Sequence, residues 1–251
     1  MKKTIQLIAT ALVMTSVVSC NQNMKETKAE DTQNESPTEI AIKSVLTAEE
    51  QASMTPDEII GRLKKGNENF VNNNTTRRDH SAQRRLAAIG QYPKAIVLSC
   101  VDSRVPVEDI FDLGIGDIFV ARVAGNIENK DIVGSMEFAT AVAGSKVIVV
   151  LGHTSCGAVK HAIDNTDAAG LGMDNLQELL NEIRPVLDNH GDKEHTSKDT
   201  AFTNMIIDEN VTKTVADIKA ASATLNAMDE EGAIKIVGAT YNMETGEVIF
   251  N

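Results

Sequence analysis

Three short aliphatic segments, separated by stretches with helical spacing, place the strongest constraint on how this chain folds. Ala95–Ser99, Asp117–Val123 and Lys146–Leu151 are rich in valine, isoleucine and leucine, which is typical of strands buried on both faces of a parallel sheet. Between them, Val107–Phe111 and Asp131–Ala143 are predicted to be helices. A strand–helix–strand order predicts a parallel sheet with right-handed crossovers. We therefore expect an α/β fold in which helices flank a central, mostly parallel β-sheet.

The flanking sequence predicts further helices and a C-terminal hairpin around this sheet. Thr55-Pro56-Asp57-Glu58 supplies a capping threonine, a proline at the first helical position and a glutamate three residues after the cap. This pattern predicts a helix through about Asn69. No internal repeat or second domain boundary is present, so we expect one folded domain over residues 45–251. The other predicted elements are helices at Ser81–Ile89, Asn175–Leu187 and Asp199 to about Met228, and a hairpin formed by Ile234–Tyr241 and Glu247–Phe250.

Composition limits the core and the partners of this domain. The 251 residues include no Trp, two Tyr and six Phe, so the core must be mainly aliphatic. The formal net charge is −12 at pH 7. A surface of this sign repels phosphate backbones and anionic lipids, so we expect no nucleic-acid partner.

The first residues resemble a bacterial export signal. Lys2 and Lys3 form a basic segment, and Thr4–Val18 is mainly apolar but too short for an ordinary transmembrane helix. Residues 1–19 are therefore predicted to be a signal peptide, and Cys20 follows a Val-Val-Ser sequence that resembles a lipobox. A plain secretory signal with an incidental cysteine is the alternative.

A lipidated Cys20 would anchor the protein to a bacterial membrane, facing the periplasm or the cell surface. Asn21 is not the Asp that marks inner-membrane retention in enteric bacteria, which favours the outer membrane. The polar run that follows is predicted to be a flexible tether over residues 20–44.

Two short motifs follow two of the predicted strands and carry the chemistry. Cys100-Val-Asp102-Ser-Arg104 follows the first strand, and His153-Thr-Ser-Cys156 follows the third. Ligands gather at the carboxyl ends of strands in open parallel sheets, so the two motifs are expected to meet. Two thiolates and one imidazole suit Zn²⁺, and three protein ligands leave a position for water, as in catalytic zinc sites. The alternative, a disulfide between the two cysteines, leaves the histidine and the Asp-Arg pair unexplained.

These motifs are similar to those of β-class carbonic anhydrases. The pair Cys-x-Asp-Ser-Arg and His-x-x-Cys, each at the end of a predicted strand, is the most specific part of the resemblance. The other matching segments are Gly66-Asn67-x-x-Phe70, Gly116-Asp117-x-Phe119-Val120-x-Arg122-x-Ala124-Gly125-Asn126, Gly134-Ser135-x-Glu137, Gly157-Ala158, Gly238-Ala239-Thr240-Tyr241 and Glu244-Thr245-Gly246.

The resemblance implies one Zn²⁺ per chain, held by Cys100, His153 and Cys156, with Asp102 and Arg104 as a catalytic dyad. The implied activity is the reversible hydration of carbon dioxide to bicarbonate and a proton by a zinc-bound hydroxide. The implied assembly is a homodimer or a homotetramer.

Several points stay open at this stage. The segment Leu113-Gly-Ile-Gly116 has no glutamine, whereas plant-like members use one there to bind substrate. His161 is a candidate proton shuttle because the imidazole pKa lies near neutrality. The alternatives to a carbonic anhydrase are a catalytically silent module that binds bicarbonate or a partner, and a metal or redox protein that uses the thiol pair. Carbonyl sulfide and carbon disulfide are alternative substrates.

Overall fold

The computed structural model describes residues 41–191 and 195–251. The predicted signal peptide, Cys20 and most of the predicted tether lie outside the described residues. The expected parallel sheet is confirmed: four parallel strands and one antiparallel strand form a sheet with the order β2-β1-β3-β4-β5. The strands are β1 (Ala95–Ser99), β2 (Ile118–Arg122), β3 (Val147–His153), β4 (Lys235–Tyr241) and β5 (Val248–Phe250).

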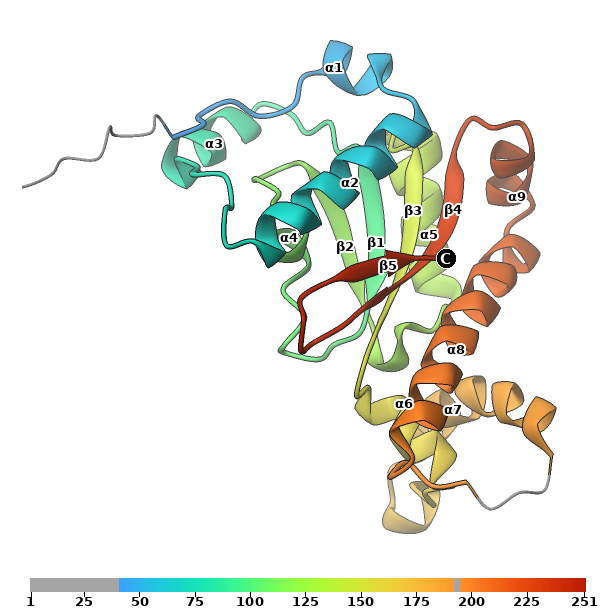
Figure 1. Ribbon diagram of the computed structural model, residues 1–251. Helices are drawn as coiled ribbons and strands as arrows, with labels where there is room; N and C mark the ends of the chain where they lie inside the picture. The colour runs from blue at the N-terminus through green and yellow to red at the C-terminus, as the bar shows by residue number, and fades with distance from the viewer. Residues whose placement is uncertain (1–40, 192–194) are drawn as a thin grey trace, which may run out of the picture. The chain divides into compact units, whose positions relative to one another are not determined.

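The predicted helices occur in the predicted order, and α1, which the sequence did not predict, precedes them (Figure 1). Helix α2 begins with the predicted capping box, in which Thr55 and Glu58 each accept the other's backbone N–H. None of the described helices is long and apolar enough to cross a membrane. The helices are α1 (Ala48–Ser53), α2 (Pro56–Val71), α3 (His80–Ala87), α4 (Val107–Ile110), α5 (Lys130–Glu137), α6 (Gly157–Ile163), α7 (Asp174–Ile183), α8 (Thr200–Ala221) and α9 (Ala223–Glu230).

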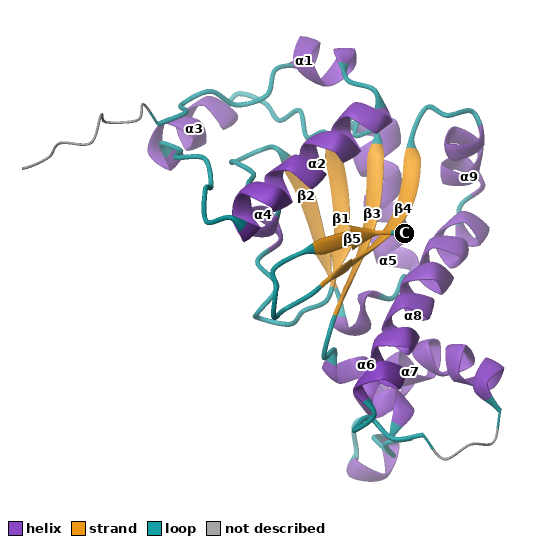
Figure 2. Ribbon diagram, in the orientation of Figure 1, coloured by secondary structure: helices purple, strands orange, loops and turns teal. Residues whose placement is uncertain are grey.

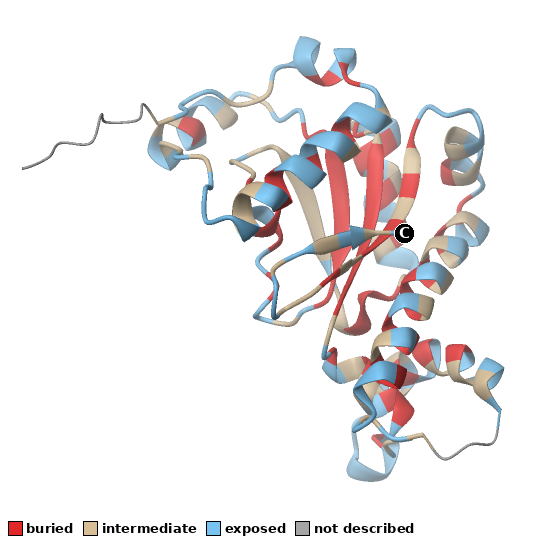
Figure 3. Ribbon diagram, in the orientation of Figure 1, coloured by how far each residue is buried: buried red, intermediate tan, exposed pale blue. Residues whose placement is uncertain are grey.

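Helices cover both faces of the sheet, and alternate residues of each strand point to opposite faces. Figure 2 shows α2 on the near side and α5 on the far side. Val97 and Val149 pack with residues of α2 and α4, while Ile96 and Ile148 pack with residues of α5, α8 and α9. Strands β1 and β3 are buried along their whole length (Figure 3). The predicted aliphatic core is therefore confirmed.

The predicted long helix from Asp199 to about Met228 is wrong in one respect, because it is two helices. Ser222 has extended backbone angles, φ −130° and ψ 105°, and separates α8 from α9. Its hydroxyl accepts the N–H of Leu225 and donates to Glu137 Oε1 at 2.6 Å. A serine favours a cap over a helix interior because its hydroxyl competes for backbone hydrogen bonds. Similarly, the predicted helix over 131–143 ends in a π-helical turn, Phe138–Val142.

The register of the sheet places the two sequence motifs at one edge. Ser99 of β1 pairs with Leu151 of β3, and β3 continues for two more residues to His153. Cys100 therefore leaves β1 beside the end of β3. Helix α6 begins at Gly157, directly after Cys156.

Candidate metal centre

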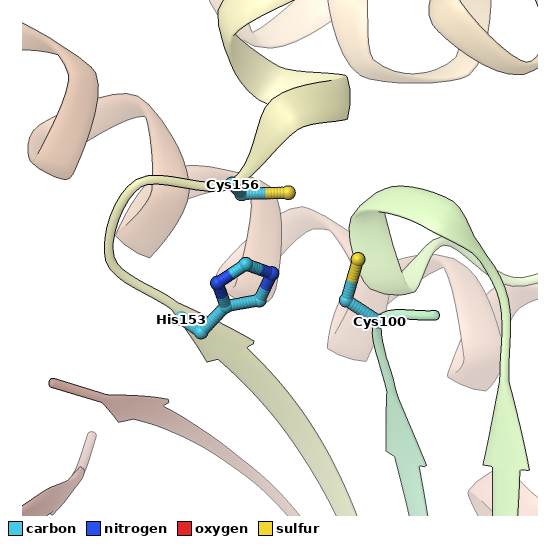
Figure 4. A group of neighbouring side chains, drawn as sticks. All are labelled: Cys100, His153 and Cys156. Carbon is cyan, nitrogen blue, oxygen red and sulfur yellow. The ribbon is translucent and has the colours of Figure 1, made fainter. Parts of the chain in front are cut away.

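Three side chains from both motifs converge at the carboxyl end of the sheet. Cys100 follows β1, His153 is the last residue of β3, and Cys156 is the N-cap of α6. Figure 4 shows the two sulfur atoms and one ring nitrogen facing a common space. The ligand atoms of the three residues lie within 4.8 Å of one another, and all three residues are buried. The sequence-predicted ligand set is thus brought together in space.

The imidazole of His153 is oriented for a metal. Its Nδ1 lies 2.9 Å from the carbonyl oxygen of Thr154. A carbonyl can only accept a hydrogen bond, so Nδ1 carries the proton and Nε2 has a free lone pair. Nε2 is buried and has no hydrogen-bond partner among residues 41–191 and 195–251. A buried lone pair without a partner, next to two thiols, fits the donor set of a zinc site.

The two thiols differ in their protonation. Both cysteines are free in the structure. A hydrogen bond from Cys156 is the main influence on Cys100 and lowers its pKa to about 4, and the backbone N–H of Gly125, 3.4 Å from Cys100 Sγ, acts in the same direction. The pKa of Cys156 is raised by that same interaction with Cys100 and by burial, although the N–H groups of Ala158 and Val159 lower it. The N–H groups at the helix start therefore favour a Cys156 thiolate, but their influence is outweighed while the two sulfurs share a proton.

Asp102 and Arg104 form an ion pair beside these ligands. The guanidinium donates from Nε to Asp102 Oδ1 at 3.0 Å and from Nη2 to Oδ2 at 2.7 Å. The backbone N–H of Arg104 also donates to Oδ1, at 2.9 Å. The Arg104 side chain is the main reason that the pKa of Asp102 falls to about 2. The carboxylate is therefore ionised at neutral pH, and Oδ2 accepts a single hydrogen bond from these donors.

Arg122 is a component of the site that the sequence did not single out for a role. It ends β2 opposite Ser99 of β1. Its Nε donates to the carbonyl of Cys100 at 2.8 Å, and its Nη2 donates to the carbonyl of Asp102 at 2.6 Å. Arg122 thereby fixes the backbone between a candidate ligand and the candidate catalytic carboxylate. The sequence feature that could have indicated this role is the position of Arg122 near the end of the predicted strand Asp117–Val123.

Two other sequence predictions concern His161 as a proton shuttle and the Leu113–Gly116 segment that lacks a glutamine. His161 lies on α6, and its Nδ1 is 3.0 Å from the hydroxyl of Thr166. Gly114, in the segment without a glutamine, lies against the buried side chain of Gln83. Gln83 is on α3, and this segment lies at the amino edge of the sheet, since Asp117 directly before β2 accepts the N–H of Lys94 directly before β1, whereas the candidate ligands lie at the carboxyl edge.

Comparisons with known proteins identify similar sequences among the carbonic anhydrases. The family model described as carbonic anhydrase matches residues 95–248. Carbonic anhydrase 2 of Mycobacterium tuberculosis is 36% identical over 189 residues, which cover 74% of this chain and 88% of that relative. A carbonic anhydrase of Mycolicibacterium smegmatis is 34% identical over 187 residues, with the same coverage. A shorter match, 33% identical over 95 residues, joins 38% of this chain to 47% of a carbon disulfide hydrolase of Saccharolobus solfataricus.

Solved structures agree with the sequence matches. The crystal structure of the β-carbonic anhydrase CafA of Aspergillus fumigatus has a TM-score of 0.59 at 27% identity, over 69% of this chain and 82% of that chain. A structure from a study of two tetrameric β-carbonic anhydrases of Sordaria macrospora has a TM-score of 0.60 at 24% identity, over 66% of this chain and 84% of that chain. The second match shows the shared fold.

Proposed function

The chain belongs to the carbonic anhydrase family and is of its β class, and from this premise we propose that it catalyses the zinc-dependent interconversion of carbon dioxide and bicarbonate. The observation that carries the proposal is the buried convergence of Cys100, His153 and Cys156 beside an ionised Asp102. Three such ligands leave a tetrahedral zinc ion one position for water, which is the arrangement of a catalytic site.

In this proposal Cys100 Sγ, His153 Nε2 and Cys156 Sγ hold one zinc ion per chain. A zinc ion held in this way would lower the pKa of a coordinated water to about 7 and so supply a nucleophile for carbon dioxide near neutral pH. Binding replaces the proton that the two sulfurs share, so both cysteines act as thiolates. The carbonyl of Thr154 keeps the proton of His153 on Nδ1.

Asp102 would orient the nucleophile. An ionised carboxylate only accepts hydrogen bonds, so an oxygen that faces it must turn a hydrogen towards it and a lone pair elsewhere. Arg104 occupies both carboxylate oxygens but leaves Oδ2 capacity for a further bond. Arg104 thus keeps Asp102 charged and aimed, while Arg122 holds the backbone on which Asp102 sits.

The alternatives have less support. A silent binding module would have no need for the complete set of two thiols, imidazole, carboxylate and guanidinium. A thiol-pair redox protein leaves the orphaned Nε2 of His153 unexplained. Carbon disulfide as substrate is supported by a match over 38% of the chain, against 74% for a relative named carbonic anhydrase.

The proposal is tested by replacing each ligand and measuring zinc and activity together. In Cys100→Ala, His153→Ala and Cys156→Ala, bound zinc and stopped-flow hydration of carbon dioxide should both disappear, because three ligands are needed to hold the ion. Ser99→Ala is the control, since Ser99 is a buried neighbour whose hydroxyl lacks a hydrogen-bond partner among the described residues. Full zinc occupancy in any ligand variant contradicts the ligand set. A wild-type protein that binds zinc without hydrating carbon dioxide contradicts the activity.

We also propose that residues 45–251 form the catalytic domain and that Cys20 anchors it to a bacterial membrane through the tether of residues 20–44. The support is the sequence pattern before residue 41. Cys20→Ser should release the processed protein from the membrane fraction while its hydration activity stays unchanged, because the anchor lies outside the domain. Persistent membrane association of the processed variant argues against lipidation.

A homo-oligomer is proposed as the working form. Strand β2 is an edge of the sheet, and unpaired edges favour pairing with another chain. Beside it, a groove of about 810 Å³ is lined by Phe119, Ile132 and Phe138. Phe138 is 50% exposed and Val142 73% exposed, on the π-helical turn. An apolar patch next to an open edge fits an isologous contact with a second copy of the chain.

A further inference from the structure

We infer that Asn210 of α8 is a positioning residue for the metal centre, because it holds the turn whose amide donates to the sulfur of Cys100. The inference rests on the proposed zinc site and extends it to a residue in a distant element. Asn210 is separated from Gly125 by 85 positions in the sequence. No sequence motif connects the two.

The turn at Gly125 and Asn126 has an uncommon backbone conformation. Gly125 has φ 72° and Asn126 has φ 44°, so two successive residues are in the left-handed region. A non-glycine residue there is uncommon, and such turns persist where the surroundings hold them. The turn lies close to its neighbours, since a Cβ on Gly125 would be 2.7 Å from Ile183 Cδ1 and 3.2 Å from Ala158 Cβ.

This conformation directs one amide at the metal ligand. The N–H of Gly125 donates to Cys100 Sγ at 3.4 Å in a buried environment. The carbonyl of the same residue accepts a hydrogen bond from Asn210 Nδ2 at 2.8 Å, also buried. Asn210 therefore restrains the peptide plane that follows Gly125, and with it the direction of the N–H that precedes it.

Asn210 is poorly explained by the stability of α8 alone. It is 1% exposed and shares the buried stripe of α8 with Ile206, Ile207 and Val211. Its Oδ1 has no hydrogen-bond partner within the part of the chain that the structure describes. Half-satisfied buried amides carry a desolvation cost that a leucine would avoid. The bond to the Gly125 carbonyl is thus what the asparagine contributes at this position.

The consequence for the metal lies in the sulfur. A hydrogen bond to a metal-bound thiolate withdraws electron density from it and tunes the metal. Without Asn210 the Gly125 turn loses one of its restraints, so the hydrogen bond to Cys100 weakens and the sulfur is held less firmly in position. We expect a sulfur that donates more strongly, but a metal affinity that falls about 10- to 100-fold, because the lost positioning of Cys100 outweighs the stronger donation.

The test is the visible and near-ultraviolet spectrum of the cobalt-substituted protein, with Co²⁺ in place of zinc. Asn210→Leu should fold, with a melting temperature lowered by loss of the buried bond to the Gly125 carbonyl, while its thiolate-to-cobalt charge-transfer band moves to lower energy. Zinc affinity, measured by competition with a chelator, should fall about 10-fold or more. Asn210→Ala serves the same purpose if circular dichroism shows that the leucine variant is not folded. Thr214→Val is the control, because Thr214 lies one turn later on the same buried face of α8.

The band position decides between a positioning role and a structural one. An unchanged band in a folded Asn210 variant overturns the inference, even where affinity falls, because a loosened fold alone could lower affinity. A shift of the same size in Thr214→Val overturns it as well. If the wild-type cobalt protein lacks a thiolate charge-transfer band, the proposed metal centre itself fails, which is a separate result.

Discussion

Among the described residues, Arg104 alone supplies the donors to the Asp102 carboxylate, two from its side chain and one from its backbone. This ion pair determines which group the Asp102 carboxylate can bind. Held by Arg104, Asp102 stays ionised and available as an acceptor; without its side-chain partner, the same charge lies beside the cation site. Arg104 therefore determines whether Asp102 interacts with a water molecule or binds the metal itself.

Replacing each member of the pair should have unequal effects. In Arg104→Ala the freed carboxylate is attracted to zinc and displaces water from the fourth position, whereas Asp102→Asn removes the orientation of the water and leaves it bound. We expect both variants to keep zinc. Arg104→Ala should lose more hydration activity at pH 8, measured by stopped flow, with losses of about 10- to 100-fold for residues that support a metal site in this way. The opposite order of rates, or a water-bound zinc in crystals of both variants, contradicts this account.

Among the contacts between elements, those of Asp112, in the loop that follows α4, join this loop to two segments that lie far from it in the sequence. Arg78 donates from Nη1 to its carboxylate at 2.6 Å and from Nη2 to its carbonyl. Asn69 of α2 and Thr76 also donate to the carboxylate, at 2.9 Å and 2.8 Å. Burial opposes ionisation of this group, but these hydrogen bonds outweigh it and lower the pKa of Asp112. The cluster connects α2, the segment before α3 and the loop that follows α4.

The lowered pKa gives a pH dependence with a definite sign. Native Asp112 stays ionised below the pH at which an unfolded aspartate takes up a proton, about 3.9. Its stabilisation is complete above that pH and is lost as the pH falls through the native pKa. Asp112→Asn leaves Arg78 without its charge partner and should destabilise the fold by about 3 kcal/mol at pH 7. In urea unfolding, the difference from wild type should shrink as the pH falls below about 3.9.

Asp57→Asn is the control for this experiment. Asp57 pairs with Lys235 on the surface, where its side chain is 77% exposed. Exposed pairs contribute about 0–1 kcal/mol, so this variant should unfold close to wild type at every pH. A gap between Asp112→Asn and wild type that stays constant from pH 7 to pH 2 would show that ionisation of Asp112 does not stabilise the fold.

How much of the structure was predictable differs from element to element. The buried strands were predictable because uninterrupted aliphatic runs such as Lys146–Leu151 have few other stable placements. The convergence of the three candidate metal ligands was predictable because both motifs follow such runs. The break at Ser222 was not, because it depends on Glu137, 85 positions away in the sequence. Asn210 and Arg122 were also missed as parts of the site, since their contacts depend on tertiary structure.

At the scale of the molecule, the β2 edge and the neighbouring π-helical turn are the surface proposed to bind a second copy. Val142→Glu should convert the oligomer to smaller species in sedimentation velocity, because it places a charge in an apolar contact that the two copies share. Val142 is 73% exposed, so folding of the single chain should not change. Ile249→Glu is the control on the opposite edge strand, where Ile249 is 64% exposed. An unchanged mass for Val142→Glu contradicts this interface.

In the proposed site, two sulfur atoms and one imidazole hold a zinc ion that keeps one position open. X-ray absorption fine structure at the zinc edge of the purified protein measures this coordination directly. We expect two sulfur neighbours at about 2.3 Å and two nitrogen or oxygen neighbours at about 2.0–2.1 Å. A zinc shell without sulfur, or one with four sulfur neighbours, contradicts it.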